Sequence, residues 1–467
     1  MGGLFGVVSK QDCVNDLFYG TDYHSHLGTR RGGLATQTPT GFSCSIHNIE
    51  SNYFRSKFEA DLSKLQGRKG IGVISDSDAQ PLVFGSHLGK FGIVTVAKIT
   101  NAQEIVDNAY QNRIHFSETS NGELSPTELI ATLICEKGSF AEGLQNAQET
   151  IKGSCSILIL TANGIYAARD KLGRTPLVIG KKDGAYAACS ETCAFPNLGF
   201  EVDRYLGPGE IVFLTAEGYE QIKKPGEKMQ ICAFLWVYYG YPASSYEGIN
   251  VEFARNRCGA ALGREDDVEI DCVAGIPDSG TGHAIGYANA KKISYIRPFV
   301  KYTPTWPRSF MPQDQSIRDL VARMKLIPIK TLIKGNRILF CEDSIVRGTQ
   351  LQDNIQILFD VGALEVHMRP ACPTLIYPCE FLNFSTSRST LDLAGRKAIK
   401  EIEGVDDRFL DEYAQADSEK NMAMVDKIRQ RLRLTSLKYQ KLENLVEAIG
   451  LPKEKLCTHC WDGSSYY

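Results

Sequence analysis

The stretch RILFCEDSIVRGTQ, residues 337–350, joins an apolar run to a polar loop and the start of a helical pattern. The apolar run predicts a strand, and it delivers two adjacent carboxylates, Glu342 and Asp343. Strand, loop and helix in this order form the unit of a doubly wound parallel sheet, in which ligands bind at the carboxyl ends of the strands. Paired carboxylates at that edge are suited to a sugar diol and, directly or through water, to Mg²⁺.

The loop between strand and helix predicts an anion site. Its backbone N–H groups, with the hydroxyls of Ser344 and Thr349, are suited to one anion at a helix N-terminus. Gly348 lets the backbone approach such a ligand closely. The alternative interpretation of this loop is an ordinary strand-to-helix turn in which an acidic side chain caps the helix. We favour the ligand site because carboxylates, hydroxyls and glycine coincide at the end of one strand.

The same alternation surrounds this stretch. VEIDCVAGIP (268–277), GTGHAIGYANAKK (280–292) and ISYIRPFV (293–300) predict strand, helix and strand, and EVHMRPACP (365–373) predicts a further strand. The first 225 or so residues differ, because short strands such as KGIGVIS alternate with helical patterns in an α+β, layered order. We place the boundary near PGEKMQ and expect domains at 1–227 and 228–397, followed by a charged helical segment at 398–467 that packs on the body.

The composition is that of an ordinary soluble globular protein. The 467 residues are 43% hydrophobic and 23% charged, with a net charge of −3. This charge gives no support for nucleic-acid binding, and no apolar run approaches the ~20 residues of a membrane span. We therefore expect a cytoplasmic protein without a membrane partner.

The chain has fourteen cysteines and no secretory signal, so disulfides are not expected. Most of them stand alone in apolar runs and are interpreted as small buried hydrophobic residues. Cys457 and Cys460, in CTHC, have a spacing that lets both thiols reach one metal centre. Such a half-site needs partners from elsewhere in the chain.

The motifs together resemble the glutamine phosphoribosyl pyrophosphate (PRPP) amidotransferase family. EDSIVRGT resembles the PRPP loop of type I phosphoribosyltransferases, and GIPDSGTGHAIGYA resembles the pyrophosphate loop. KYTPTWPRSFMPQDQSIRDLVARMKLIPI resembles the flexible catalytic loop, and GIYAARDKLGRTPLVIG, CSETCAF and GPGEIVFL resemble the N-terminal-nucleophile (Ntn) glutaminase domain. The resemblance covers nearly the whole chain and implies an αββα sandwich followed by a type I phosphoribosyltransferase sheet and C-terminal helices.

The resemblance also implies residue roles. Glu342 and Asp343 would be catalytic and hold Mg²⁺. The implied PRPP ligands are Ser344, Ile345, Val346, Arg347, Gly348, Thr349, Asp278, Ser279, Gly280, Lys301, Arg308 and Lys325. The cysteine site gains Cys232, in ICAFLWVYYGYPAS, and Cys379, in YPCEF, beside Cys457 and Cys460. Four thiolates suit a [4Fe–4S] cluster or a tetrahedral zinc, and the resemblance favours a structural cluster.

The glutaminase positions of the family are replaced. Gly2 stands where the family has its nucleophilic cysteine, and no arginine for the glutamine carboxylate occurs between residues 71 and 81. Val96 and Ala97 replace the oxyanion Asn-Gly, and Pro126 replaces the aspartate that pairs the substrate amine. We expect a domain of this fold without glutaminase chemistry. Thr29, Arg30 and Arg31 are interpreted as a charged turn, with a new anion site as the alternative.

The expected function is transfer of an amine to PRPP, giving 5-phosphoribosylamine, the first committed step of purine synthesis. The amine would be ammonia, either free or supplied by another protein. A different amine acceptor is an alternative, because TWPRSF departs from the wording of the family's loop. A non-catalytic regulatory paralogue is another, which the intact PRPP loop disfavours. A homo-oligomer, dimer or tetramer, is expected from the resemblance.

Overall fold

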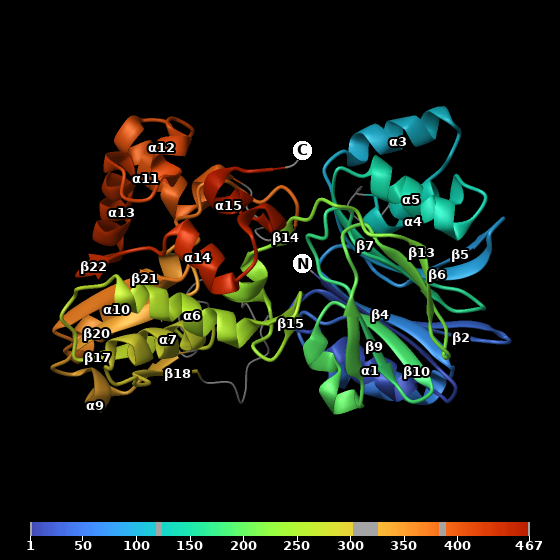
Figure 1. Ribbon diagram of the computed structural model, residues 1–467, viewed down its shortest axis with the longest axis horizontal. Helices are drawn as coiled ribbons and strands as arrows, with labels where there is room; N and C mark the ends of the chain where they lie inside the picture. Colours follow the sequence, from blue (N-terminus) through green and yellow to red (C-terminus); the bar gives the residue numbers. More distant parts are fainter. Residues whose placement is uncertain (1, 118–123, 302–325, 383–388, 466–467) are drawn as a thin grey trace.

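The computed structural model describes residues 2–117, 124–301, 326–382 and 389–465, apart from the side chains of Thr349 and Gln350. Two halves lie side by side, and both chain ends lie near their junction (Figure 1). The first half contains two antiparallel sheets, and the second contains one parallel sheet covered by helices. No helix within the described ranges is long and apolar enough to cross a membrane.

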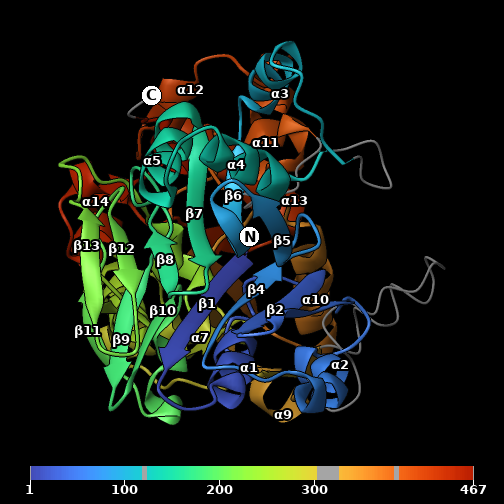
Figure 2. The same cartoon turned by 90° about the vertical axis from the view of Figure 1, so that its right-hand side faces the viewer.

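The first half is a four-layer αββα sandwich (Figure 2). Its seven-stranded sheet has the order β11 (Glu201–Tyr205), β9 (Val178–Lys182), β10 (Ala185–Cys189), β1 (Gly2–Ser9), β4 (Lys69–Ser75), β2 (Arg31–Thr38), β3 (Gly41–Asn48). Its six-stranded sheet has the order β13 (Tyr219–Lys223), β12 (Ile211–Leu214), β8 (Ile165–Ala168), β7 (Gly153–Leu160), β6 (Gly89–Ile99), β5 (Leu82–Ser86).

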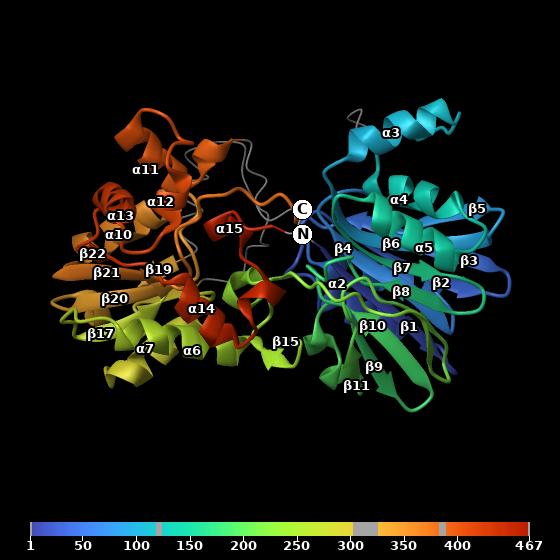
Figure 3. The same cartoon turned by 45° about the horizontal axis from the view of Figure 1, so that its top comes forward.

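Strand β1 is buried on both faces because it lies inside the sandwich. Leu4 and Val8 pack against the second sheet, while Phe5 and Val7 pack toward helix α1 (Val14–Asp22). The outer face of the second sheet is covered by helices (Figure 3). These helices are α3 (Ala102–Gln111), α4 (Pro126–Cys135) and α5 (Phe140–Thr150). The first residues of the chain are therefore part of the core.

The second half contains a parallel sheet with the order β17 (Cys272–Gly275), β20 (Arg337–Glu342), β21 (Glu365–Pro370), β22 (Ser436–Leu437). Apolar residues alternate along β20: Ile338 and Phe340 face one helical layer, and Leu339 and Cys341 face the other. The first layer contains α10 (Thr349–Val361), α11 (Ala394–Glu403) and α13 (Glu419–Leu432). The second contains α6 (Val251–Arg264) and α7 (Thr281–Lys291). The expected doubly wound arrangement is confirmed.

The prediction that residues 293–300 form a strand of this sheet is wrong. Within ISYIRPFV, Tyr295 makes a single bridge to Val273, and the regular strand is the short β18 (Phe299–Lys301). β18 pairs antiparallel with β19 (Leu326–Pro328), outside the parallel sheet. Pro298 has no N–H to donate to a ladder, so it interrupts the expected strand.

The C-terminal residues join the rest of the chain rather than forming a separate body. Helix α14 (Leu442–Ile449) packs on α6. β23 (Leu456–Cys457) pairs with β14 (Ile231–Cys232), and α15 (His459–Asp462) follows it. The remaining helices are α2 (Phe54–Phe58), α9 (Lys330–Ile333) and α12 (Leu410–Ala414), and a strand pair is formed by β15 (Ser245–Tyr246) and β16 (Ile249–Asn250). The domain limits at 227/228 and 397/398 stay predictions, and α11 spans the second.

Candidate active site and cysteine site

Glu342 and Asp343 lie at the carboxyl end of β20, a central strand of the parallel sheet. Both side chains are buried, with exposed fractions of 9% and 6%. Ser279, in the loop after β17, donates a hydrogen bond from Oγ to Oε1 of Glu342 at 3.0 Å. Ser344 Oγ donates to Oδ1 of Asp343 at 2.5 Å. The loops after β17 and β20 therefore meet at the carboxylate pair.

Burial, and then the negative charge of Asp343, raise the pKa of Glu342 well above its usual range. Two carboxylates in one small site resist simultaneous ionisation unless a cation joins them. Burial lowers the pKa of the Arg255 guanidinium, and the negative charge of Asp343 is the largest effect that opposes this shift. The Arg255 guanidinium also donates to the carbonyl oxygens of Trp236, Tyr238 and Gly240. No sequence motif pointed to Arg255, because it lies on α6, far from residue 343 along the chain.

Two helices begin at this edge of the sheet. Gly280 precedes α7, and a Cβ there would lie 2.2 Å from the carbonyl oxygen of Cys341, so only glycine permits this approach. Gly348 precedes α10 with a φ of +77°. The peptide bond between Pro277 and Asp278 is cis. Both helix N-termini therefore follow glycine-containing loops, as the sequence predicts for two anion sites.

The basic residues are only partly described. Lys301 Nζ lies 2.9 Å from Oδ2 of Asp278, so β18 is linked to the loop after β17. Arg347 forms an exposed pair with Asp392 at 3.4 Å. Ile345 is buried, and the Val346 carbonyl accepts a hydrogen bond from the Ala394 N–H. Arg308, Lys325 and the TWPRSF segment lie outside the described residues.

The four predicted cysteines are brought together at the junction of the two halves. Cys232 pairs with Cys457 in the two-stranded sheet of β14 and β23. The Cys460 thiol contacts Cys379, and this contact is the main reason that the pKa of Cys379 falls to about 6. Cys232 lies within electrostatic range of both Cys379 and Cys457. Sequence positions more than 200 residues apart thus share one site.

Across the described ranges, no set of three or more His, Cys, Asp or Glu side chains has an arrangement that could hold a single metal ion. A structural zinc needs its ligands to converge on one ion. In an iron–sulfur cluster each thiolate binds its own iron.

Gly2, Val96 and Ala97, which we expect to stand at glutaminase positions of the family, line a very small cavity. Its volume is about 20 Å³, which is room for about one water molecule. It is lined by Gly2, Ser75, Ser77, Thr95, Val96, Ala97, Ser154 and Leu382. A Cβ on Gly2 would lie 3.3 Å from Cγ2 of Val96 and 2.5 Å from the carbonyl oxygen of Ile74. The expected neighbourhood of Gly2, Val96 and Ala97 is present, whereas the cavity is far too small for glutamine.

A self-contained polar network borders this cavity. Buried Gln80 forms hydrogen bonds with the backbone N–H and carbonyl of Thr95. Gln80 also donates to Asp78, which accepts from Ser125 and from the N–H of Thr127. Pro126, the first residue of α4, lies between Ser125 and Thr127 and does not line the cavity. The Asp78 carboxylate is therefore used internally.

The charged turn has its own partners. Asp76 accepts hydrogen bonds from the Thr29 N–H and, through its carbonyl, from Arg30. Arg30 also lies 3.9 Å from Glu50, with both side chains about half exposed. Arg31 begins β2. These contacts agree with the interpretation as a charged turn.

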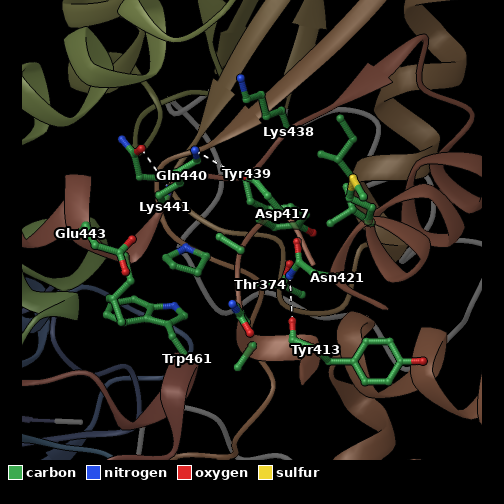
Figure 4. A pocket seen from close by; sticks show the side chains of 18 of the residues that line it. Thr374, Tyr413, Asp417, Asn421, Lys438, Tyr439, Gln440, Lys441, Glu443 and Trp461 are labelled. Carbon is green, nitrogen blue, oxygen red and sulfur yellow. Dashed lines mark hydrogen bonds and ion pairs between the residues drawn. The ribbon is translucent and has the colours of Figure 1, made fainter. Parts of the chain in front are cut away.

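A second, larger cavity of about 920 Å³ lies between α13, α15 and residues 436–443 (Figure 4). Trp461, Tyr439 and Thr374 point toward it, and Lys441 and Asp417 form an ion pair at its wall. None of its lining residues belongs to the loops that follow β17 and β20. No motif in the sequence predicted it.

Comparisons with known proteins agree with this architecture. Residues 67–197 match the model of the glutamine amidotransferase domain family. An amidophosphoribosyltransferase of Bacillus subtilis is 31% identical over 86% of this chain and 85% of its own. One of Methanothermobacter thermautotrophicus is 29% identical over 99% and 93%. The solved glutamine PRPP amidotransferase of B. subtilis, complexed with ADP and GMP, superposes with a TM-score of 0.85 at 28% identity, over 99% of this chain and 97% of that one.

Proposed function

The chain belongs to the amidophosphoribosyltransferase family of pentosyltransferases, and we propose that it forms 5-phosphoribosylamine from PRPP and ammonia. The proposal is carried by the contact of Ser279 with Glu342, because this contact brings the loops after β17 and β20 to one edge of the sheet. A ligand with phosphates at both ends of a ribose has one helix N-terminus for each.

In this arrangement the 5-phosphate lies on the N–H groups of residues 344–349, and the pyrophosphate lies on Asp278, Ser279 and Gly280. Glu342 and Asp343 hold the ribose hydroxyls and stabilise the positive charge that develops on the sugar. The ammonia nitrogen forms a bond to C1 as the bond from C1 to the pyrophosphate oxygen breaks. The ammonium product then loses one proton. Lys301, Arg308 and Lys325 are the proposed cationic phosphate ligands.

The carboxylate pair fits Mg²⁺, which proteins commonly bind through one or two carboxylates together with substrate phosphates. Bound there, Mg²⁺ would neutralise charge on the departing pyrophosphate. The protein's own contribution is to hold the two carboxylates in a buried, preorganised pair.

We propose that glutamine is not the nitrogen source. A nucleophile, an oxyanion donor and two substrate-binding groups are replaced, and the remaining cavity has room for about one water. The nitrogen would arrive as ammonia, free in solution or from another protein. The four cysteines would hold a [4Fe–4S] cluster with a structural role, because it would link the ends of β14 and β23 to the Cys379 segment.

The direct test is a pyrophosphate-release assay with PRPP, Mg²⁺ and ammonium chloride. The proposal expects release that depends on all three components, and phosphoribosylamine in equal amount. Pyrophosphate release with no aminated product would mean hydrolysis, and no release with saturating ammonium would contradict the proposed activity.

A further inference from the structure

Strand β6, which carries Val96 and Ala97, contacts the segment that contains Cys379. Lys98, directly after Val96 and Ala97 on β6, donates a hydrogen bond from Nζ to the carbonyl oxygen of Cys379 at 2.8 Å. Ser154, on the neighbouring β7, donates from Oγ to the carbonyl oxygen of Phe381 at 2.5 Å. Both contacts join residues more than 200 positions apart.

The same segment closes the small cavity beside Gly2. Leu382, three residues after Cys379, is 4% exposed and lines that cavity together with Val96. The Leu382 N–H also donates to the sulfur of Cys379 at 3.3 Å. The chain that carries a proposed cluster ligand therefore fills the space around the former nucleophile position.

A second cation of the first half, the buried Arg174, also contacts this segment. Arg174 is 0% exposed, and its guanidinium carbon lies 3.8 Å from the centroid of the Phe381 ring. The guanidinium donates to the Gly153 carbonyl and to Gln230 Oε1, which fix its direction. Its backbone carbonyl accepts from the N–H of Cys232 at 3.1 Å.

The Arg174 side chain also contacts Cys457. Arg174 and Lys98 thus reach the segments of Cys232, Cys379 and Cys457. Thiolates that bind a metal are stabilised by nearby cations and by hydrogen bonds that fix their backbone.

We propose that the glutaminase-like half supports the four-cysteine site through these contacts. Lys98, Ser154 and Arg174 form what we call the cysteine seat, and Lys98 and Arg174 are its positioning residues. The identity of the bound group in this inference rests on the proposed cluster. The contacts of Lys98, Ser154 and Arg174 are present in the protein whichever group the cysteines bind.

The test compares Lys98→Met and Arg174→Lys with the control Lys90→Met, since Lys90 is exposed on the same strand. The readouts are iron per chain after anaerobic purification and the rate at which visible absorbance is lost in air. Loss of a supporting contact should speed this decay about tenfold. This is the lower end of the losses in metal affinity seen when residues that support metal ligands are mutated. Decay at the control rate in both variants would overturn the proposal.

A metal-free readout separates this inference from the cluster assignment. Amide hydrogen exchange of residues 379–382, measured by mass spectrometry on metal-free protein, should be faster in Lys98→Met than in wild type and in Lys90→Met. Equal rates in all three proteins would show that Lys98 does not hold the Cys379 segment. Wild-type protein without iron would contradict the cluster, while faster hydrogen exchange of residues 379–382 in metal-free Lys98→Met would still support the cysteine seat.

Discussion

Ser279 donates a hydrogen bond to Glu342 at 3.0 Å, and this bond joins the loops after two neighbouring parallel strands. The relationship fixes one carboxylate of the pair before any ligand arrives. Ser279 lies in the loop that precedes α7, so the bond also holds this loop beside β20. A ligand that spans both loops then meets a prepared site.

Asp343→Asn should reduce amine transfer to PRPP on the order of 100-fold or more, a loss typical of removing one group that stabilises developing charge. Its carboxylate accepts a hydrogen bond from the adjacent Ser344 at the end of β20, outside the apolar clusters of the core, so the fold should persist. Steady-state kinetics with circular dichroism measure both effects. Asp353→Asn, on the exposed face of α10, is the control. Near-wild-type turnover by Asp343→Asn would show that the acidic pair has been misassigned.

Glu342→Gln should abolish activity and yet stabilise the ligand-free protein at pH 8. Burial and the Asp343 charge raise the pKa of Glu342, so its protonated form is favoured in the folded protein. Its contribution to stability is fully present below the unfolded pKa, near 4.5, and is lost as the pH rises through the folded pKa. Thermal unfolding at pH 8 and at pH 4.5 should show a gain for the variant that vanishes at the lower pH.

A gain of equal size at both pH values would show that the effect does not arise from ionisation of Glu342. Mg²⁺ offers a further check, because a cation at the pair removes the cost of ionisation. Adding Mg²⁺ with PRPP should therefore reduce the advantage of Glu342→Gln at pH 8.

Anaerobically purified protein should be brown and contain about four irons per chain, as four thiolate ligands of one cluster imply. Cys379→Ser should lose most of this iron, since serine does not supply a thiolate. Metal analysis and visible absorbance measure both. Stoichiometric zinc without iron would replace the cluster by a zinc site and keep the four cysteines as ligands.

Gly2→Cys should not create glutaminase activity. A Cβ at this position meets the Ile74 carbonyl oxygen at 2.5 Å, and Leu382 and Val96 fill the cavity beside it. Each missing substrate contact is worth ~2 to 4 kcal/mol, and two of them slow hydrolysis by roughly three orders of magnitude. Glutamate release from glutamine measures this, with Gly2→Ser as the control for bulk. Substantial glutamate from the cysteine variant alone would mean that the pocket is intact.

The fold was largely predictable from local patterns. KGIGVIS coincides with β4, and the alternation in RILFCE matches two different helical layers. ISYIRPFV failed because its apolar period is that of a strand, whereas Pro298 breaks the ladder. A pattern of side chains predicts which face is buried but not which partner strand the backbone finds.

The active-site loops were predictable because each lies within one continuous segment. The cysteine seat was not predictable, because Lys98, Ser154 and Arg174 are distant along the chain from residues 379–381, which they contact. Arg255 escaped notice for the same reason: it is distant from Asp343 along the chain, and the charge of Asp343 affects its pKa only in the folded protein. Such contacts depend on tertiary arrangement, which spacing along the chain does not encode.

The central claim is that this chain transfers ammonia, and not glutamine nitrogen, to PRPP. The most direct measurement is phosphoribosylamine formation by one wild-type preparation, with PRPP and Mg²⁺, in parallel with ammonium chloride and with ammonia-free glutamine, recording glutamate release in the second reaction. The account predicts product with ammonium, and neither product nor glutamate with glutamine. Phosphoribosylamine with an equal amount of glutamate from glutamine would contradict it.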